Sequence, residues 1–320
     1  MRLRRLAALA ALSLALTACG SGGGSGANAL RIMAPAAPGG GWDQTSRIAE
    51  QAFRSVDQSR KVEVYNVPGA GGSIGLAQLA GEKGNGDLLM TMGLVMVGAL
   101  EQNKSKVTLA DTTPIAKLTE EYEIVVVPAD SPYATLADLV TAWKADPAKI
   151  AIAGGSAGGT DHIVAGLMAK AGGIDPKSVN YIAHSGGGEA LNALLGNKVA
   201  MGISGIGEFA EHVKSGKLRA LGVSSPARLG NVDAPTLKEA GLDVELANWR
   251  GFVAPGGLDD AATKNLTDLV TKMHDSQAWK DAVTKNGWAD VFQTGKPFAD
   301  FLTAEQTKIK AVIAEMGLVS

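Results

Sequence analysis

One local arrangement recurs along this chain and constrains its fold more than any other feature: an apolar strand, a loop rich in glycine and serine, and then a helix. It occurs at residues 38–43 (PGGGWD), 68–75 (PGAGGSIG), 154–161 (GGSAGGTD) and 184–190 (HSGGGEA), and more loosely at 202–208 (GISGIGE). Strands that alternate with helices predict an α/β fold, with mostly parallel sheets and helices on both faces. The loops at the carboxyl ends of such strands are where ligands bind.

The length of the chain favours two domains over one core. Two of the glycine-rich loops precede the apolar strand EIVVVP at 123–128, and the other loops follow it. We therefore expect domain 1 to comprise residues 29–127 plus 250–320, and domain 2 to comprise residues 128–249. The alternative is one continuous domain.

The first residues have the pattern of a secretory signal. Three arginines within residues 1–5 precede a short apolar run, Leu6–Leu16, and then the sequence LTAC, which ends at Cys19. This sequence looks like a bacterial lipobox, which predicts a signal peptide over 1–19, lipidation of Cys19 and a flexible linker over 20–28. The protein would then be extracytoplasmic and anchored to the cell membrane by its lipid. The alternative is a cleavage site that happens to contain cysteine.

Composition excludes several classes of function. Without the three arginines of the first five residues, the 30 basic residues fall to 27, against 32 acidic ones. No basic run is present, so we expect no nucleic-acid partner. Aromatic residues make up 5% of the chain, too few for a stacking platform. No spacing of metal ligands occurs and Cys19 is the only cysteine, so we expect neither a metal nor another cofactor.

Glycine-rich loops that open helices can bind anions without basic side chains. Glycine lets the backbone approach a ligand closely, and a helix N-terminus presents free N–H groups and a partial positive charge. The hydroxyl groups of Ser73, Ser156, Thr160 and Ser185 add possible donors. The alternative for any single loop is ordinary turn chemistry. Four similar loops could converge on one cleft, which favours an anion-binding site.

Two other interpretations of these loops are weaker. The pattern G-x-S-x-G occurs at 71–75 and 154–158 and is typical of a hydrolase with a serine nucleophile, for which His274 could serve as the base. Glycine-serine loops produce this pattern by chance, and His162 follows its own serine too closely. The loop 68–75 lacks the third glycine of a dinucleotide site, because Ile74 stands there. We therefore expect a binding protein without catalytic residues, and keep a serine esterase as an alternative.

Five segments together resemble a known family. They are PAAPGGGWDQTSR (35–47), NVPGAGGSIG (66–75), GGSAGGTDH (154–162), SGGGEALNALLGNKVAMGIS (185–204) and NWRGFVAP (248–255). In this order they look like the substrate-binding proteins of tripartite tricarboxylate transporters, also called the Bug family. The resemblance implies two α/β domains that close on a ligand like a Venus flytrap, with a small organic carboxylate held between their loops. It also implies delivery of the ligand to membrane permease subunits, and we expect a monomer.

The resemblance carries ligand-binding roles onto loops of both domains. The expected ligand-binding residues are Ala37, Gly39, Gly40, Gly41, Trp42, Asp43, Ser73, Met92, Gly93, Ser156, Gly159, Thr160, His162, Ser185, Gly186, Ser204 and Arg250. Ser204 stands where many members carry an acidic residue. A sensory binding module would have the same fold, and the sequence does not distinguish it from a transport receptor.

Two charged residues in this set keep two interpretations each. Asp43 can cap its helix by accepting free N–H groups, or it can bind a hydroxyl or ammonium group of the ligand. Arg250 can grip a second carboxylate of the ligand, or it can form a salt bridge at the hinge. The first role for Arg250 would favour dicarboxylates or tricarboxylates.

Overall fold

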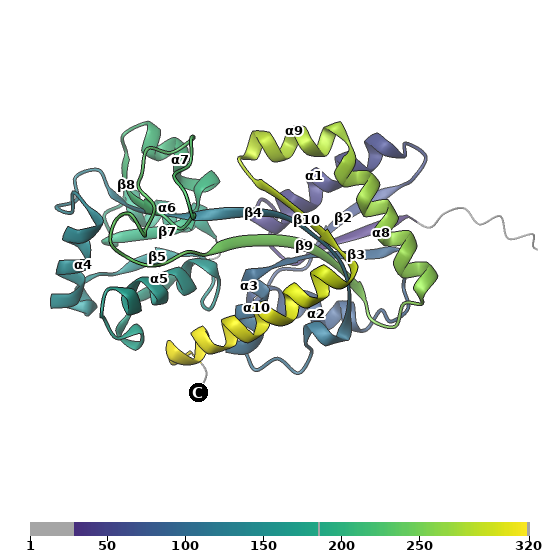
Figure 1. The fold of residues 1–320 in the computed structure, drawn as a ribbon, viewed down its shortest axis with the longest axis horizontal. Helices are drawn as coiled ribbons and strands as arrows, with labels where there is room; N and C mark the ends of the chain where they lie inside the picture. Colours follow the sequence, from purple (N-terminus) through teal and green to yellow (C-terminus); the bar gives the residue numbers. More distant parts are fainter. Residues whose placement is uncertain (1–28, 185, 319–320) are drawn as a thin grey trace, which may run out of the picture.

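Two long antiparallel strands, β4 (Thr112–Pro128) and β9 (Ala247–Pro255), join the two lobes of the protein (Figure 1). In the computed structural model, residues 29–184 and 186–318 are described. β4 pairs with β9 from Thr112 to Tyr122, and from Glu123 onward it pairs with β7 (Met201–Gly205) instead. We call residues 29–122 and 247–318 lobe 1, and residues 123–246 lobe 2.

Lobe 1 has helices on both faces of its part of the sheet (Figure 1). Its remaining strands are β1 (Leu30–Ala34), β2 (Val62–Asn66), β3 (Leu88–Gly93) and β10 (Ala289–Thr294). The helices on one face are α1 (Gly41–Val56), α8 (Asp260–Asp275) and α9 (Gln277–Asn286), and they share an apolar cluster with Leu30 and Ile32 of β1. The other face is covered by α2 (Ser73–Ala80), α3 (Leu94–Gln102) and α10 (Gly295–Glu315).

Lobe 2 repeats this layered arrangement on a smaller scale. Its further strands are β5 (Ile152–Gly154), β6 (Tyr181–Ala183) and β8 (Leu218–Val223). Its helices are α4 (Leu136–Ala145), α5 (Thr160–Ala171), α6 (Gly187–Leu195) and α7 (Ile206–Lys214). Alternate residues of β4 face opposite ways, as in any strand. Val125 therefore packs with α4 and α5, whereas Ile124 packs with α6 and α7.

The sheet is mixed, so the expectation of mostly parallel pairing needs correction. Ten strands form one sheet in the order β2-β1-β3-β9-β4-β7-β5-β6, with β8 and β10 also paired to β4. β1 is parallel to β2 and β3, and β5 is parallel to β6 and β7, whereas every pairing of β4 and β9 is antiparallel. The chain runs out to lobe 2 along β4 and returns along β9, which makes the centre antiparallel. The predicted α/β class, with helices on both faces, is confirmed.

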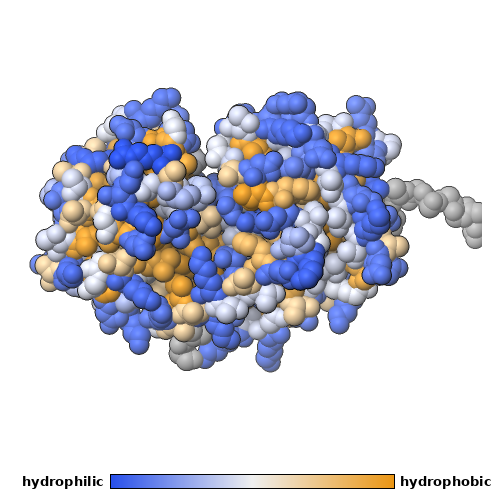
Figure 2. Space-filling model, viewed as in Figure 1, coloured by the Kyte–Doolittle hydropathy of each residue, from blue (hydrophilic) through white to orange (hydrophobic). Residues whose placement is uncertain are grey.

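The lobes contact each other below the crossing strands. A Cβ atom on Gly98 of α3 would overlap the carbonyl oxygen of Gly158, so the backbones of the two lobes touch there. The end of α10 reaches α5, where Met316 lies against Gly166 and Lys170 pairs with Glu315 at 2.6 Å. One apolar cluster extends through both lobes on this side. This packing leaves the opposite side open, where Figure 2 shows a notch between the lobes.

The expected signal peptide, lipidated Cys19 and linker lie outside the described residues. Within residues 29–184 and 186–318, none of the helices has both the length and the apolar character needed to cross a membrane.

Candidate functional site

The first glycine-rich loop runs from β1 to α1 and is fixed by Asp43. Its carboxylate accepts the Gly39 N–H at 2.8 Å and bonds from Asn66 at 2.8 Å and Arg47 at 3.0 Å. Burial raises the pKa of Asp43, but the bonds from Arg47, Gly39 and Asn66 outweigh burial and leave the pKa below its usual value. Because both carboxylate oxygens already have partners, this geometry favours the loop-fixing role of Asp43 over contact with a ligand.

Trp42 ties the first loop to the second loop and to the end of β3. A Cβ atom on Gly72 would lie 2.8 Å from Cζ3 of Trp42, and one on Gly93 would lie 3.3 Å from its Nε1. Glycine is required at both positions, because a Cβ atom on Gly93 would also overlap the carbonyl oxygen of Trp249. Met92 is fully buried beside them, and Ser73 Oγ donates to the Ala70 carbonyl at 2.8 Å. Three of the predicted segments of lobe 1 therefore do meet, with the indole ring between them.

In lobe 2, the loop between β5 and α5 is held by its own helix. Asp161 accepts the Gly155 N–H at 2.6 Å, and His162 Nδ1 accepts the Gly158 N–H at 3.1 Å. The His162 ring stacks on Tyr181 with a centroid distance of 4.0 Å. Burial lowers the pKa of His162 to about 4, so the ring is neutral at neutral pH. His162 therefore shapes the loop and brings no positive charge to an anion.

The next two loops of lobe 2 meet around Gly187. Ser204 Oγ donates to Glu208, and a Cβ atom on Gly187 would overlap both of these side chains. A Cβ atom on Gly155 would lie 3.9 Å from the Cα atom of Gly186, which brings the β5–α5 loop to the same place. Ser185 lies outside the described residues.

Arg250 is engaged in an ion pair at the crossing strands. Its guanidinium pairs with Glu121 of β4, lies 3.4 Å from Thr45 Oγ1 and stands 5.5 Å above the Trp288 ring. A Cβ atom on Gly41 would lie 2.6 Å from the same guanidinium, so Arg250 also supports the first turn of α1. Of the two roles expected for Arg250, this geometry favours the hinge salt bridge.

Close contacts link the glycine-rich segments of both lobes around β4 and β9. Gly41 is in close contact with the guanidinium of Arg250, which pairs with Glu121. A Cβ atom on Gly205 would lie 3.1 Å from Glu121 Oε1. On the other side, a Cβ atom on Gly159 would lie 3.4 Å from Val95 at the start of α3. The N-termini of helices from both lobes are thus gathered at the place where the chain crosses between them.

These N-termini carry no side-chain caps. The helices α1, α3, α5, α6 and α7 begin after Gly40, Gly93, Gly159, Gly186 and Gly205, and no described side chain caps any of them. The first N–H groups of a helix have no partner within the helix and attract negative charge. An anion between the lobes could therefore be bound largely by backbone groups.

The sequence interpretation missed a group of acidic side chains at the same crossing. It consists of Glu121 and Glu123 on β4, Asp161 at the start of α5, and Glu208 on α7, and we call it the acidic cluster. Burial first, and then the fields of neighbouring carboxylates, raise the pKa of Glu123 well above its usual value. Burial likewise raises the pKa of Asp161 to about 7. The available signal was the spacing of two residues between Glu121 and Glu123, which puts both on one face of a strand.

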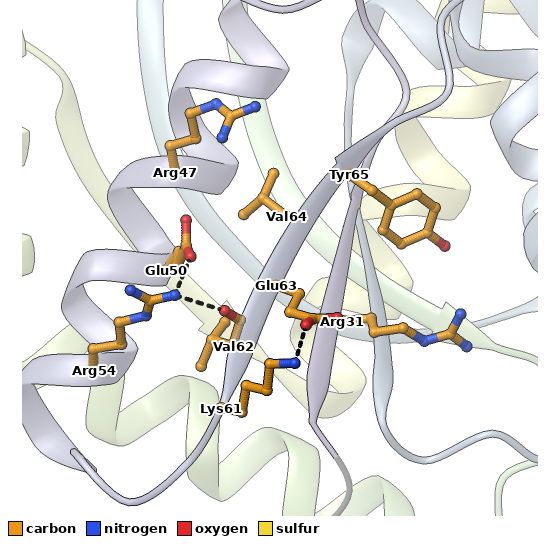
Figure 3. Close-up of a pocket in the computed structure, with 9 residues that line it drawn as sticks. All are labelled: Arg31, Arg47, Glu50, Arg54, Lys61, Val62, Glu63, Val64 and Tyr65. Atoms are coloured by element: carbon orange, nitrogen blue, oxygen red, sulfur yellow. Dashed lines mark hydrogen bonds and ion pairs between the residues drawn. The ribbon is translucent and has the colours of Figure 1, made fainter.

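A separate hollow lies at the β2 edge of lobe 1 (Figure 3). It is lined by charged side chains of α1, β1 and β2. Arg54 pairs with Glu50 at 2.6 Å, and Lys61 pairs with Glu63 at 2.5 Å. Exposed pairs of this kind are a common feature of protein surfaces and contribute little. We assign no ligand to this hollow.

Residues 46–318 match the family described as the tripartite tricarboxylate transporter family receptor. The chain is 29% identical over 294 residues to a protein encoded in the gbd 5' region of Cupriavidus necator, covering 90% of this chain and 88% of that one. It is 27% identical over 301 residues to BugT of Bordetella pertussis, covering 91% and 90%. Both likenesses extend over nearly the whole chain.

Solved structures show the same fold. A TctC solute binding protein from Polaromonas has a TM-score of 0.70 and 25% identity, covering 89% of this chain and 98% of that one. MatC from Rhodopseudomonas palustris, solved with bound malate, has a TM-score of 0.76 and 22% identity, covering 89% and 98%. An R. palustris protein solved with adipate has a TM-score of 0.79 and 19% identity, covering 90% and 97%. The predicted resemblance is confirmed: this chain belongs to the family of tripartite tricarboxylate transporter receptors, which are solute-binding proteins.

Proposed function

We propose that this protein captures a small organic carboxylate between its two lobes and delivers it to a membrane permease. The observation that carries this proposal is the gathering of uncapped, glycine-started helices from both lobes at the crossing strands. Their backbone N–H groups suit a carboxylate, and the notch in Figure 2 gives access from one side. The malate and adipate of the two R. palustris structures belong to the same chemical class.

The proposed binding groups come mainly from the backbone. In lobe 1 they are the N–H groups at the starts of α1 and α3, next to Gly40 and Gly93. In lobe 2 they are those at the starts of α5 and α6, with the Thr160 hydroxyl, whose Oγ1 is buried without a partner in the described part of the chain. Trp42, Asp43 and His162 would shape these loops. Closure of the lobes on the ligand would be a hinge motion about β4 and β9.

Three further parts of the proposal come from the sequence and the family. The domain division at residues 127 and 249, the lipid anchor at Cys19 and the permease partner stay predictions. We also propose that the protein carries out no chemistry on its ligand. Ser73 Oγ donates to a backbone carbonyl, and both ring nitrogens of His274 lie 3.0 Å from aspartate oxygens, those of Asp275 and Asp290, so these two groups do not support a serine–histidine couple.

A thermal-shift experiment tests the proposed function. The purified chain is heated with malate, adipate, citrate and other small carboxylates, with matching neutral amides as controls. A ligand at 100 times its Kd adds about 2.7 kcal/mol to the native state that binds it. We expect a carboxylate to raise the melting temperature and its amide to have no effect. The proposal fails if no carboxylate does so and mass spectrometry of the denatured protein finds no carboxylate carried through purification.

A further inference from the structure

The long helix α10 belongs to lobe 1 at its start and contacts lobe 2 at its end. Near its start, Phe298 and Phe301 pack edge-on against Trp249 of β9, with ring centroids 6.3 and 5.1 Å away. Trp249 Nε1 also donates to Glu305 of α10 at 3.1 Å. The helix then runs below the crossing strands and ends beside α5 of lobe 2 (Figure 1). It therefore adds a non-covalent connection between the lobes to the covalent ones made by β4 and β9.

The contact at the end of α10 is mainly apolar. Met316 is 4% exposed, and a Cβ atom on Gly166 of α5 would lie 2.5 Å from the Met316 sulfur. Lys170 of α5 pairs with Glu315 at 2.6 Å, but these two side chains are 58% and 48% exposed. Exposed ion pairs contribute little to stability. The close packing of Met316 on Gly166 is therefore the main part of this contact.

The sequence of α10 offers no position at which the helix would readily bend. Sharp kinks in helices are almost always at proline or glycine, and residues Phe298–Met316 contain neither. Because the start of α10 is held against Trp249, the whole helix should move with lobe 1. A hinge motion about β4 and β9 moves α5 with lobe 2. Such a motion would separate Gly166 from Met316.

This separation would expose apolar surface next to the proposed binding groups. Ile309 and Ile313 of α10 are fully buried in the same apolar cluster as Ile163 and Met168 of α5. Exposing such surface to water is unfavourable, so the packing of α10 on α5 opposes opening of the lobes. The first turn of the same α5, at Thr160, supplies proposed ligand-binding groups. The contact that holds α5 against α10 therefore also keeps these groups close to lobe 1.

We propose that the end of α10 is a latch, in which Glu315 and Met316 hold Lys170 and Gly166 of α5, and that this latch must release before the lobes open. When only a fraction of a protein has the arrangement that binds, its apparent affinity falls by that fraction. The latch would therefore strengthen binding of any ligand held between the lobes. This consequence rests on the proposed function, whereas the release of the latch can be measured without a ligand.

Small-angle X-ray scattering tests the latch, because separated lobes have a larger radius of gyration. The protein is first dialysed from urea to free it of bound small molecules. Met316→Ala should increase the radius of gyration relative to the wild type. Gly166→Ala should do the same, because the new Cβ atom displaces Met316, although alanine favours the helix α5 more than glycine does. Circular dichroism checks that both variants are folded. A radius of gyration that neither variant increases would overturn the proposal.

A cross-link tests the release directly. With Cys19→Ser removing the only cysteine, Lys170→Cys and Glu315→Cys are joined by a short bifunctional thiol reagent across the lobes. Lys310 pairs with Glu101 of α3 at 3.7 Å within lobe 1, so Lys310→Cys with Glu101→Cys is the matched control. In the Gly166→Ala background, the cross-link between the lobes should restore the wild-type radius of gyration, and the control should not.

Two results of the cross-linking experiment would contradict the latch. If both cross-links restore the radius of gyration, or if neither does, the lobes do not open at this contact. None of these measurements depends on which molecule binds. A thermal-shift panel without any binding carboxylate would remove the proposed function and leave the latch, whereas an unchanged radius of gyration would remove the latch and leave the proposed function.

Discussion

Two groups of helices in this protein begin differently, and the difference follows their position. At α4, α8 and α9, away from the notch, the side chains of Thr135, Asp259 and Ser276 accept N–H groups of the first turn. At the crossing of the lobes, the helices start at glycines, and no side chain of the described residues caps them. A side-chain cap stabilises a helix by about 1 kcal/mol relative to alanine. The crossing helices forgo this stabilisation and keep their N–H groups available for a ligand.

The two kinds of helix start also treat an acidic residue differently. Asp138 in α4 is exposed, and the bond from Thr135 holds its pKa below the usual value. Asp161 in α5 is at the equivalent end of its helix, but burial raises its pKa to about 7. The same residue type is thus an exposed capping residue in one region and a carboxyl group with a raised pKa in the other. The predictions below test this contrast, from the largest expected effect to the smallest.

The largest expected effect is on the pH dependence of stability. Because the folded pKa of Asp161 is raised from 3.8 to about 7, its stabilising contribution is complete below pH 3.8 and is lost as the pH rises towards 7. Relative to Asp161→Asn, the protein should lose unfolding free energy as the pH rises across this range, by up to about 1 kcal/mol per pH unit, because Asp161 titrates together with the neighbouring Glu123. Urea unfolding of both proteins from pH 4.5 to 7.5 measures the difference. Asp138→Asn is the control and should show no such slope above pH 5, and parallel curves for Asp161→Asn would contradict the prediction.

A methyl group on Gly187, the first residue of α6, should weaken ligand binding. A Cβ atom on Gly187 would overlap Glu208 and Ser204, whereas one on Gly188 would meet no atom within 4 Å. We expect Gly187→Ala to reduce the affinity for the ligand about thirtyfold, which is about 2 kcal/mol. Gly188→Ala should keep the affinity. Calorimetry with the tightest carboxylate of the panel compares them, and equal losses in the two variants would remove Gly187 from the site.

A cap can also be installed where the structure lacks one. Gly186 precedes α6 in an extended conformation (φ 167°), and a Cβ atom there would meet nothing within 4 Å. Gly186→Ser should therefore be tolerated and raise the unfolding free energy by a few tenths of a kcal/mol, because serine caps better than glycine. Ligand affinity should fall about tenfold, since the new hydroxyl occupies an N–H group that the ligand would use. Unchanged affinity, measured alongside the stability, would mean that the start of α6 does not bind the ligand.

The sequence predicted the features that depend on local pattern. Strand–loop–helix units and the glycines of the first loop follow from residues close together in the chain. The capping interpretation of Asp43 was wrong about the partner, because its carboxylate accepts the Gly39 N–H, which precedes α1, and no described side chain caps that helix. The direction of strands does not, because an apolar run reads alike in parallel and antiparallel sheets. The mixed pairing of β4 and β9 could therefore not be derived from their composition.

For a related reason, only the pairing of Glu121 and Glu123 on one face of a strand could have been predicted, and not the whole acidic cluster. Glu121 and Asp161 are far apart in sequence, and Glu123 sits in a segment that reads as an ordinary apolar strand. Only the crossing of β4 brings these carboxylates together. The two roles of Arg250 differ in whether its partner carboxylate belongs to the ligand or to the protein. The structure places a carboxylate of the protein, that of Glu121, against Arg250. The acidic cluster and the partner of Arg250 both depend on contacts between residues far apart in the sequence.

The smallest expected effect tests the other half of the contrast, at the capped start of α4. Thr135 accepts the Asp138 N–H at 3.2 Å, and Asp138 bonds back to the Thr135 N–H at 2.9 Å, which completes a capping box. Thr135→Ala should reduce the unfolding free energy by about 1 kcal/mol, because the first turn loses its acceptor. Ligand affinity should not change, since α4 begins far from the crossing strands (Figure 1). Urea unfolding and calorimetry on the same sample give both quantities. A change in affinity as large as that of Gly186→Ser would mean that a helix start acts on binding through overall stability rather than through its N–H groups.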